Sequence, residues 1–296
     1  MTAPYASPMS KRAFLAVPLL LAAVACAPVD EEDPDAAADP TPTDASQCEK
    51  DNLPVLTEGR LTIGTDSPAY EPWFSDNDPT NGKGYESAVA YAVAEELGFG
   101  ADEVTWVKVP FNTSYKPGAK EFDFDINQIS ITPKRAEVVD FSDGYYQAAQ
   151  AVIALEGSPV AAVSSIAELA DYNLGAQTGT TSLTAIRDVI APANDPAVFE
   201  DTNAAKQALM NDQVDAILAD LPTAFYITAV EIPKSSIIGQ FQPESGEQEE
   251  FGMLFEKGNE LVPCVNEALA TMRDDGTLDA IQQEWLSDVV DVPELQ

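Results

Sequence analysis

The chain has 296 residues, is 45% hydrophobic and 8% aromatic, and carries 50 acidic residues against 15 basic ones, with no histidine. This length can bury one large or two medium hydrophobic cores. A formal net charge of −35 repels nucleic acid and anionic lipid, so neither is expected as a partner. The absence of histidine excludes Ser-His-Asp and Cys-His catalysis and histidine-ligated zinc, and we expect no cofactor or metal.

Residues 1–25 are predicted to be a secretory signal peptide. Lys11 and Arg12 precede an apolar stretch of about twelve residues, whereas a helix needs ~20 to span a bilayer. The small residues before Cys26 resemble the lipobox of bacterial lipoproteins, in which the cysteine is acylated and becomes the new N-terminus. A plain cleaved signal, with Cys26 incidental, is the alternative.

An acidic segment follows Cys26 and contains several prolines but no aromatic residue. Such a segment cannot bury enough apolar area to offset the entropy of ordering it. Residues 26–52 are therefore predicted to be a lipidated N-terminus followed by a disordered tether. This unit would hold the folded body outside the cell membrane through its lipid anchor.

The remaining cysteines, Cys48 and Cys264, form an even pair in an oxidising compartment. A disulfide between them would join the start of the folded body to its last helical region. Closing so long a loop stabilises a protein by ~4 kcal/mol in the chain-entropy model. Two free buried thiols are the alternative.

Strand-like and helix-like patterns alternate from about residue 60. The expected strands are 60–65, 104–109, 122–127, 149–155, 173–177, 197–201, 215–220 and 250–256. The expected helices are 86–98, 164–172, 181–190, 204–213, 221–230, 261–275 and 278–288. This alternation is typical of an α/β protein with parallel sheets.

Polar clusters follow several of the predicted strands, at 66–70, 127–135, 178–181 and Asp220. Ligands of open α/β sheets bind beyond the carboxyl ends of the strands, so these clusters predict a binding site. A zwitterion needs a guanidinium and hydroxyls for its carboxylate, a carboxylate for its ammonium and apolar groups for its stem. For the carboxylate the candidates are Arg135, Thr180 and Thr181, and for the ammonium they are Asp220 and Ser130. Tyr70 and Phe111 are the candidates for contact with the apolar stem.

Each candidate also has a structural interpretation. Arg135 can form a surface salt bridge to Glu137 or Asp140, and Thr180 and Asp220 can cap helices. The two aromatic residues can belong to the core.

From about residue 53 to its end, the chain resembles the polar amino-acid-binding group of bacterial extracellular solute-binding proteins, the capture subunits of ABC importers. The resemblance is carried by IGTDSPAYEPWF, GKGYESAVAYAVAEELG, FDFDINQISITPKRAEVVDFSDGYY, LGAQTGTTS, DAILAD and LATMRDDGTLDAIQQEWL. It implies a two-lobed periplasmic-binding-protein-like fold, with a ligand cleft between two α/β lobes joined by two crossover strands. The first lobe would comprise 53–150 and 240–296, and the second 151–239.

The resemblance also implies roles for single residues. Arg135 matches the arginine that binds the α-carboxylate, with Thr180 and Thr181 assisting. Asp220 matches the acid that binds the α-ammonium, together with Ser130 and the backbone near Gln128. Tyr70 and Phe111 match the hydrophobic clamp, and Asp66 matches a position that holds the end of the ligand's side chain.

Four positions depart from the family pattern. Ala88 stands where a second acid is frequent, although Glu86 is kept, and Asp125, Asn127 and Gln128 are unusually polar. Asp66, Asp125, Asn127 and Gln128 favour a ligand with a polar or cationic side chain. The scarcity of basic residues argues against an acidic ligand, and a well-placed Lys83 would overturn that argument.

The implied function is capture of an amino acid by a monomeric binding protein that delivers it to the importer's membrane subunits. One alternative is a dehydratase-like enzyme that uses Asp125, Glu86 or Asp220 as acid or base. The other is a ligand-sensing protein, which would need a transmembrane helix and a signalling domain after the binding lobes. We expect a binding protein and no enzyme.

Overall fold

A computed structural model of the protein describes residues 45–242, 248–286 and 292–296. The predicted signal peptide, Cys26 and residues 27–44 lie outside the described residues. Residues 45–52 form two 3-10 turns, at Ala45–Cys48 and Lys50–Asn52. The folded body therefore begins earlier than the predicted boundary at residue 53, because Cys48 is bonded to the rest of the fold. Among the helices that the structure describes, none has the length and apolar character needed to cross a bilayer.

The first sheet has five strands in the order β2-β1-β3-β12-β4. They are β1 (Leu61–Thr65), β2 (Val104–Lys108), β3 (Phe124–Asp125), β4 (Val139–Phe141) and β12 (Leu254–Glu256). β1 pairs in parallel with β2 and β3, whereas β12 runs antiparallel to β3 and β4. The carboxyl ends of β1, β2 and β3 consequently lie at the same edge of the sheet.

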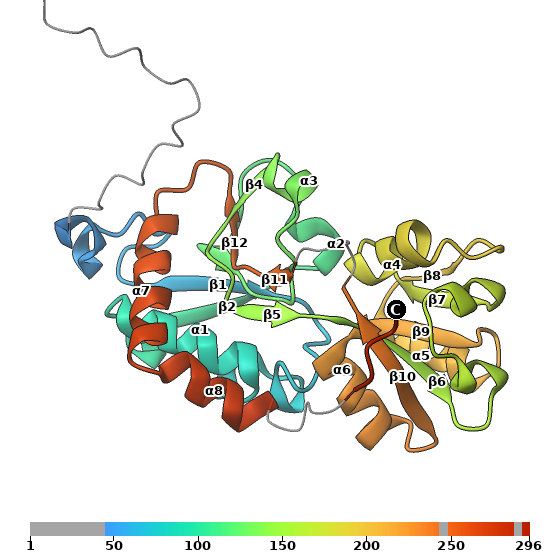
Figure 1. Cartoon of the computed structure of the whole chain (residues 1–296). Coiled ribbons are helices and arrows are strands. Elements are labelled where there is room, and N and C mark those ends of the chain that lie inside the picture. The colour runs from blue at the N-terminus through green and yellow to red at the C-terminus, as the bar shows by residue number, and fades with distance from the viewer. Residues whose placement is uncertain (1–44, 243–247, 287–291) are drawn as a thin grey trace, which may run out of the picture. The chain divides into compact units, whose positions relative to one another are not determined.

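Helices α1 (Tyr85–Glu96), α7 (Val262–Asp274) and α8 (Thr277–Leu286) pack against one another beside this sheet (Figure 1). They share a core with β1 and β3, and all three tryptophans of the chain, Trp73, Trp106 and Trp285, belong to it. Trp73 is fully buried and meets the ring of Tyr146 edge-on, with 5.3 Å between the ring centroids. Two short helices, α2 (Phe111–Ser114) and α3 (Pro133–Ala136), lie in the loops after β2 and β3. We call this body the first lobe.

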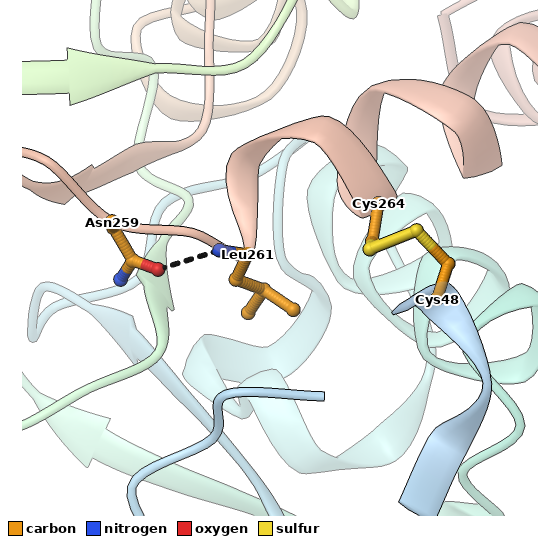
Figure 2. The surroundings of a disulfide bond; sticks show 4 residues. All are labelled: Cys48, Asn259, Leu261 and Cys264. Atoms are coloured by element: carbon orange, nitrogen blue, oxygen red, sulfur yellow. Dashed lines mark hydrogen bonds between the residues drawn. A yellow bond between two sulfur atoms is a disulfide. The ribbon is translucent and has the colours of Figure 1, made fainter. Parts of the chain in front are cut away.

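The predicted disulfide joins Cys48 to Cys264 in α7, 216 residues apart in sequence, with 5.3 Å between the two Cα atoms (Figure 2). At the start of the same helix the Asn259 side chain accepts a 2.8 Å hydrogen bond from the Leu261 amide (Figure 2). The N-terminal turns are thus covalently attached to a helix of the first lobe.

The second sheet also has five strands, in the order β10-β6-β9-β7-β8. They are β6 (Gln150–Leu155), β7 (Leu174–Gln177), β8 (Ala197–Phe199), β9 (Ala216–Asp220) and β10 (Ser235–Phe241). β7 runs parallel to β8 and β9, whereas β6 is antiparallel to β9 and β10. We call this sheet and its helices the second lobe.

Helices follow the parallel strands of the second sheet closely. They are α4 (Thr181–Ala185), α5 (Thr202–Met210) and α6 (Leu221–Tyr226). The predicted helices 181–190 and 221–230 each end in a π-helical turn, at Ile186–Ile190 and Ile227–Glu231. The predicted helix 164–172 is a 3-10 turn, Ala167–Asp171, and a second 3-10 turn covers Pro159–Ala162.

The two sheets are linked by an antiparallel pair, β5 (Tyr146–Ala148) and β11 (Glu249–Phe251). β5 leads directly into β6, and β11 leads into β12, so the chain passes between the sheets at this pair. The arrangement is the two-lobed α/β fold that was predicted.

Three further sequence predictions need correction. The predicted strand 250–256 is split into β11 and β12, because the chain changes from pairing with β5 to pairing with β3 and β4. The predicted strand 122–127 is reduced to β3, since the backbone turns at Gln128, where φ is 46°. Residues 292–296, predicted in the first lobe, pack on the second, where Leu295 is buried and its amide donates to the Gln240 carbonyl at 2.9 Å.

Candidate functional site

The carboxyl ends of strands from both lobes surround a cavity of about 50 Å³. Eight of the nine residues predicted to bind ligand line it: Asp66, Tyr70, Phe111, Gln128 and Ser130 from the first lobe, and Thr180, Thr181 and Asp220 from the second. Asn127, Gln177, Thr202 and Thr223 also line it, and the sequence analysis had not assigned the last three. Residues from distant parts of the chain meet here because parallel strands end at the same sheet edge.

Arg135 lies beside this cavity and lines an adjoining groove of about 740 Å³. Ser130, Thr180 and Thr181 line both spaces. The Arg135 guanidinium donates to the carbonyl of Ser130 at 2.7 Å and to that of Gly179 at 3.0 Å. Arg135 is therefore separated from the cavity by residues that both spaces share.

The guanidinium of Arg135 is buried without a carboxylate partner among the described residues, whose ion pairs do not include it. It lies 5.6 Å from the Phe111 ring centroid and 5.0 Å from that of Tyr115. Asp140, one of its alternative partners, pairs with Lys257 at 2.7 Å. Burial lowers the pKa of Arg135, which indicates that its charge is poorly solvated.

The lobes contact each other around the cavity. The indole nitrogen of Trp73 donates to the Thr223 hydroxyl at 2.8 Å, and the hydroxyls of Ser130 and Thr181 lie 3.3 Å apart. Gly179 has a φ of 77°, and a Cβ at this position would lie 2.5 Å from the side-chain oxygen of Asn112. A residue without a side chain is thus required for this close approach.

Thr180 and Asp220 differ in their helix-capping roles. The Thr180 hydroxyl accepts from the Leu183 amide at 3.1 Å, so Thr180 caps α4 as the structural interpretation expected. Asp220 precedes α6 but its side chain makes no capping bond. It accepts a 2.9 Å hydrogen bond from the Gln150 side chain instead, which leaves it turned toward the cavity that it lines.

Gln150 and Glu249 were not predicted as site residues, yet their side chains link Asp220 of the second lobe to Ser130 of the first through hydrogen bonds. Gln150 is fully buried, and its amide nitrogen donates to Asp220 at 2.9 Å and to Glu249 at 2.8 Å. Glu249 also accepts from the Ser130 hydroxyl at 2.6 Å, while Ser182 donates to the Gln150 side-chain oxygen at 2.5 Å. A glutamine at the start of the apolar run 150–155 was the available signal for this network.

Removal from water raises the pKa of Asp220 well above its ordinary value, and the charge of Glu249 adds to the effect. The hydrogen bond from Gln150 and the guanidinium of Arg135 oppose this shift. Burial also raises the pKa of Tyr70, whose hydroxyl has no hydrogen-bond partner. Its ring lies 5.7 Å from the Lys206 ammonium.

Glu86 stabilises the turn at Gln128 through hydrogen bonds. Its buried carboxylate accepts from the Gln128 amide at 2.6 Å, and also from the Gln128 side chain and the Tyr145 hydroxyl. Burial raises the pKa of Glu86 to about 7, although these hydrogen bonds lower it. The Gln128 side chain is therefore engaged with Glu86, which fixes the loop that leads to Ser130.

Asp125 and Asn127 are buried polar residues of the first lobe with unmatched atoms. Neither carboxyl oxygen of Asp125 has a hydrogen-bond partner, nor does the side-chain nitrogen of Asn127. Asn127 lines the cavity, whereas Asp125 does not. Burial raises the pKa of Asp125 well above its ordinary value.

Asp66 joins two loops at the cavity. Its two oxygens accept from the Ser67 amide at 2.6 Å and the Phe111 amide at 3.1 Å, so it positions the start of α2 as well as lining the cavity. Across residues 45–242, 248–286 and 292–296, no cluster of three or more cysteine, aspartate or glutamate side chains could hold a metal ion.

Two α/β lobes, joined by two segments and enclosing a polar cavity at their strand ends, define a two-lobed ligand-binding protein. Residues 61–288 match the family of bacterial extracellular solute-binding proteins, family 3. The chain belongs to this family.

Individual proteins agree with this assignment. The chain is 30% identical to the L-cystine-binding protein TcyA of Bacillus subtilis (strain 168) over 243 residues, which cover 80% of this chain and 84% of TcyA. It is 26% identical to the L-cystine-binding protein TcyJ of Escherichia coli (strain K12), over 78% of this chain and 84% of TcyJ.

Solved structures show the same fold. The arginine-, lysine-, histidine-binding protein ArtJ from Geobacillus stearothermophilus superposes with a TM-score of 0.66 and 26% identity, covering 78% of this chain and 97% of ArtJ. The ancestral amino acid-binding protein AncCDT-1, a precursor of cyclohexadienyl dehydratase, superposes with a TM-score of 0.63 and 29% identity, covering 77% of this chain and 95% of AncCDT-1.

Proposed function

We propose that this solute-binding protein captures an amino acid with a polar or cationic side chain and delivers it to the membrane subunits of an ABC importer. One observation carries the proposal. A buried guanidinium without a carboxylate partner, on Arg135 of the first lobe, lies in the groove that adjoins the cavity, and the half-buried carboxyl group of Asp220 lines the cavity from the second lobe. A zwitterionic α-amino acid supplies the two complementary charges.

Capture requires the lobes to separate. A cavity of about 50 Å³ is much smaller than the roughly 150 Å³ of a cavity that binds benzene, and is too small for an amino acid. The ligand's carboxylate would replace the backbone contacts of Arg135 and reach Thr181, and its ammonium would bind Asp220. Its stem would lie between Tyr70 and Phe111, and closure would follow from the added contacts with the second lobe.

The residues around the stem favour a polar or cationic side chain. Asp66 adds a carboxylate to the cavity wall, and the side-chain nitrogen of Asn127 is buried without a partner. The chain's relatives include binders of L-cystine and of arginine, lysine and histidine by name.

We propose that the protein does not catalyse a reaction on its ligand. AncCDT-1 is described as a precursor of a dehydratase, so the fold alone does not decide this question. The test is to incubate the protein with each bound amino acid and follow the proton NMR spectrum of the amino acid. The spectrum should stay unchanged, and a new set of product signals would contradict this part of the proposal.

We also propose that the protein is a monomer anchored outside the cell membrane through acylated Cys26. The support is the sequence around Cys26 alone, since residues 1–44 lie outside the described residues. Mass spectrometry of the mature protein should find a lipid on this cysteine, and Cys26→Ala should release the protein from the membrane fraction. Size-exclusion chromatography of the folded body checks the oligomeric state.

The capture function is tested by a thermal-shift screen against the twenty amino acids, L-cystine and common polyamines. At least one polar or cationic amino acid should raise the melting temperature, because a ligand that binds only the folded state stabilises it. Isothermal calorimetry then gives the affinity. No stabilisation by any of these compounds would overturn the proposal.

A further inference from the structure

Asp220 and Glu249 receive hydrogen bonds from the same nitrogen. The side-chain amide of Gln150 donates to Oδ1 of Asp220 at 2.9 Å and to Oε2 of Glu249 at 2.8 Å. The two carboxyl groups are therefore within about 6 Å of each other. Two acids this close, one buried and one half-buried, do not readily ionise together, so the pair retains a proton.

The charged groups around the pair act in both directions, since carboxyl groups favour the retained proton and the Arg135 guanidinium opposes it. Glu86 in α1 adds a negative charge near Asp220, and Tyr146 in β5 faces the same region. Arg135 in α3 and its neighbour Tyr115 face the pair from the groove side. The guanidinium of Arg135 forms no ion pair with either acid and bonds to backbone carbonyls instead.

Glu249 and Asp220 differ in the number of hydrogen bonds that they accept and in their exposure. Glu249 accepts two hydrogen bonds, from Ser130 at 2.6 Å and from Gln150, and is 7% exposed. Asp220 accepts only the bond from Gln150 and lines the cavity. Two donated hydrogen bonds stabilise the ionised form of Glu249 better than one stabilises that of Asp220, so Asp220 is the acid that keeps the proton. Desolvation and the charge of Glu249 both raise the pKa of Asp220, in agreement with this assignment.

We propose that Asp220 is protonated in the ligand-free protein because Glu249 lies beside it, and that an incoming ammonium group displaces this proton. The displacement of the proton by an ammonium group rests on the proposed function, whereas the protonation of Asp220 does not. On binding, the O–H bond of Asp220 breaks, the proton passes to solvent, and an ammonium N–H donates to the resulting carboxylate. Glu249 is a positioning residue that acts through Asp220 and couples capture to pH.

The direction of the pH dependence follows from competition between protons and the ligand for the Asp220 carboxylate. Below the pKa of Asp220 in the ligand-free protein, protons compete with the ligand, so affinity falls by up to tenfold for each unit by which the pH is lowered. In Glu249→Gln the neighbouring charge is removed and Asp220 is ionised at a lower pH. The affinity of this variant should therefore depend less on pH near neutrality.

The first measurement needs no ligand. Infrared spectra of the ligand-free protein at pH 7 should contain a protonated-carboxyl band, beside those expected from the raised pKa values of Asp125 and Glu86, that is lost in Asp220→Asn and also in Glu249→Gln. Glu250→Gln is the matched control, because Glu250 is the next residue of β11 and does not line the cavity. It should keep the band, and a spectrum of Asp220→Asn that equals that of the parent protein overturns the inference.

The second measurement is calorimetry with L-arginine as the probe, in phosphate and in Tris at pH 7. The buffer dependence of the heat counts protons, and about one proton should be released for each L-arginine bound. Glu249→Gln should release almost none, whereas Glu250→Gln should match the parent protein. Binding of L-arginine without proton release overturns the inference. Failure of L-arginine and every other amino acid to bind, with the infrared band as expected, rejects the proposed function but keeps the proton assignment.

Discussion

The first lobe keeps buried polar atoms without hydrogen-bond partners, whereas the second lobe has its polar groups bonded in a network. Among the described residues the unmatched side-chain atoms belong to Thr65, Tyr70, Asp125 and Asn127, all in the first lobe. In the second lobe Asp220, Thr181 and Ser182 are all bonded to Gln150, at the start of β6. Unmatched buried polar groups are destabilising, so the first lobe needs other sources of stability.

The structure contains two such sources. The Cys48–Cys264 disulfide and the aromatic cluster around Trp73 both belong to the first lobe. Binding sites are held in place by rigid surroundings, and unmatched polar atoms at the cavity are available to a ligand. The disulfide and the aromatic cluster thus lie in the same lobe as the unmatched polar groups and offset part of their energetic cost.

The largest expected effect is on stability. Replacing both cysteines by alanine should lower the free energy of unfolding by about 4 kcal/mol, because the disulfide closes a loop of 216 residues. Urea unfolding followed by tryptophan fluorescence measures this in the first lobe, where all three tryptophans lie. Hydrogen exchange at the amides of β7 and β9, in the second lobe, should change less than exchange at amides of the first lobe. An equal loss of stability in both lobes would contradict the view that the disulfide stabilises the first lobe in particular.

The next effect is on binding. Arg135→Ala should weaken amino acid binding by about 4 kcal/mol, because it leaves the ligand's carboxylate without its partner in a desolvated site. Lys134→Ala is the matched control, since Lys134 is adjacent in α3 but exposed. It should leave the affinity unchanged in calorimetry. Retained affinity in Arg135→Ala would remove this residue from the site.

The smallest effect is a change in the pH dependence of stability. Burial raises the pKa of Asp125, so its contribution is fully favourable below the ordinary carboxyl pKa of about 4 and is lost as the pH rises through the pKa of the folded state. Asp125→Leu should therefore raise the free energy of unfolding at pH 8 by about 2 kcal/mol, with a smaller gain at pH 4.

Asp123 provides the control for Asp125. It is also buried, but its carboxylate accepts hydrogen bonds from the amides of Leu56 at 2.7 Å and Thr62 at 2.6 Å. Asp123→Leu should destabilise the protein because both amides lose their acceptor. Urea unfolding of the two variants at pH 4 and pH 8 compares them directly. A loss of stability in Asp125→Leu at pH 8 would show that Asp125 has a bonding role.

The predictions of secondary structure succeeded because the information for them is local. Apolar periodicity and turn residues predicted most of the strands and helices, and polar clusters after strands identified residues that meet at one cavity. The predicted disulfide is present. The position of Arg135 beside the cavity, in the groove, was not predicted, because it depends on backbone carbonyls of both lobes.

By itself, the sequence determined an α/β protein with ligand-type residues at its strand ends, since those features repeat within short windows, and the two-lobed arrangement was implied by its resemblance to a family. Only the tertiary structure decided that Gln150, Asp220 and Glu249 form one network. These residues come together because β6 pairs with β9 while β5 pairs with β11. Long-range strand pairing also decided that residues 292–296 pack on the second lobe, through the bridge from Gln240 to Glu294. No local pattern encodes which distant strand a segment meets, so these contacts follow from the fold.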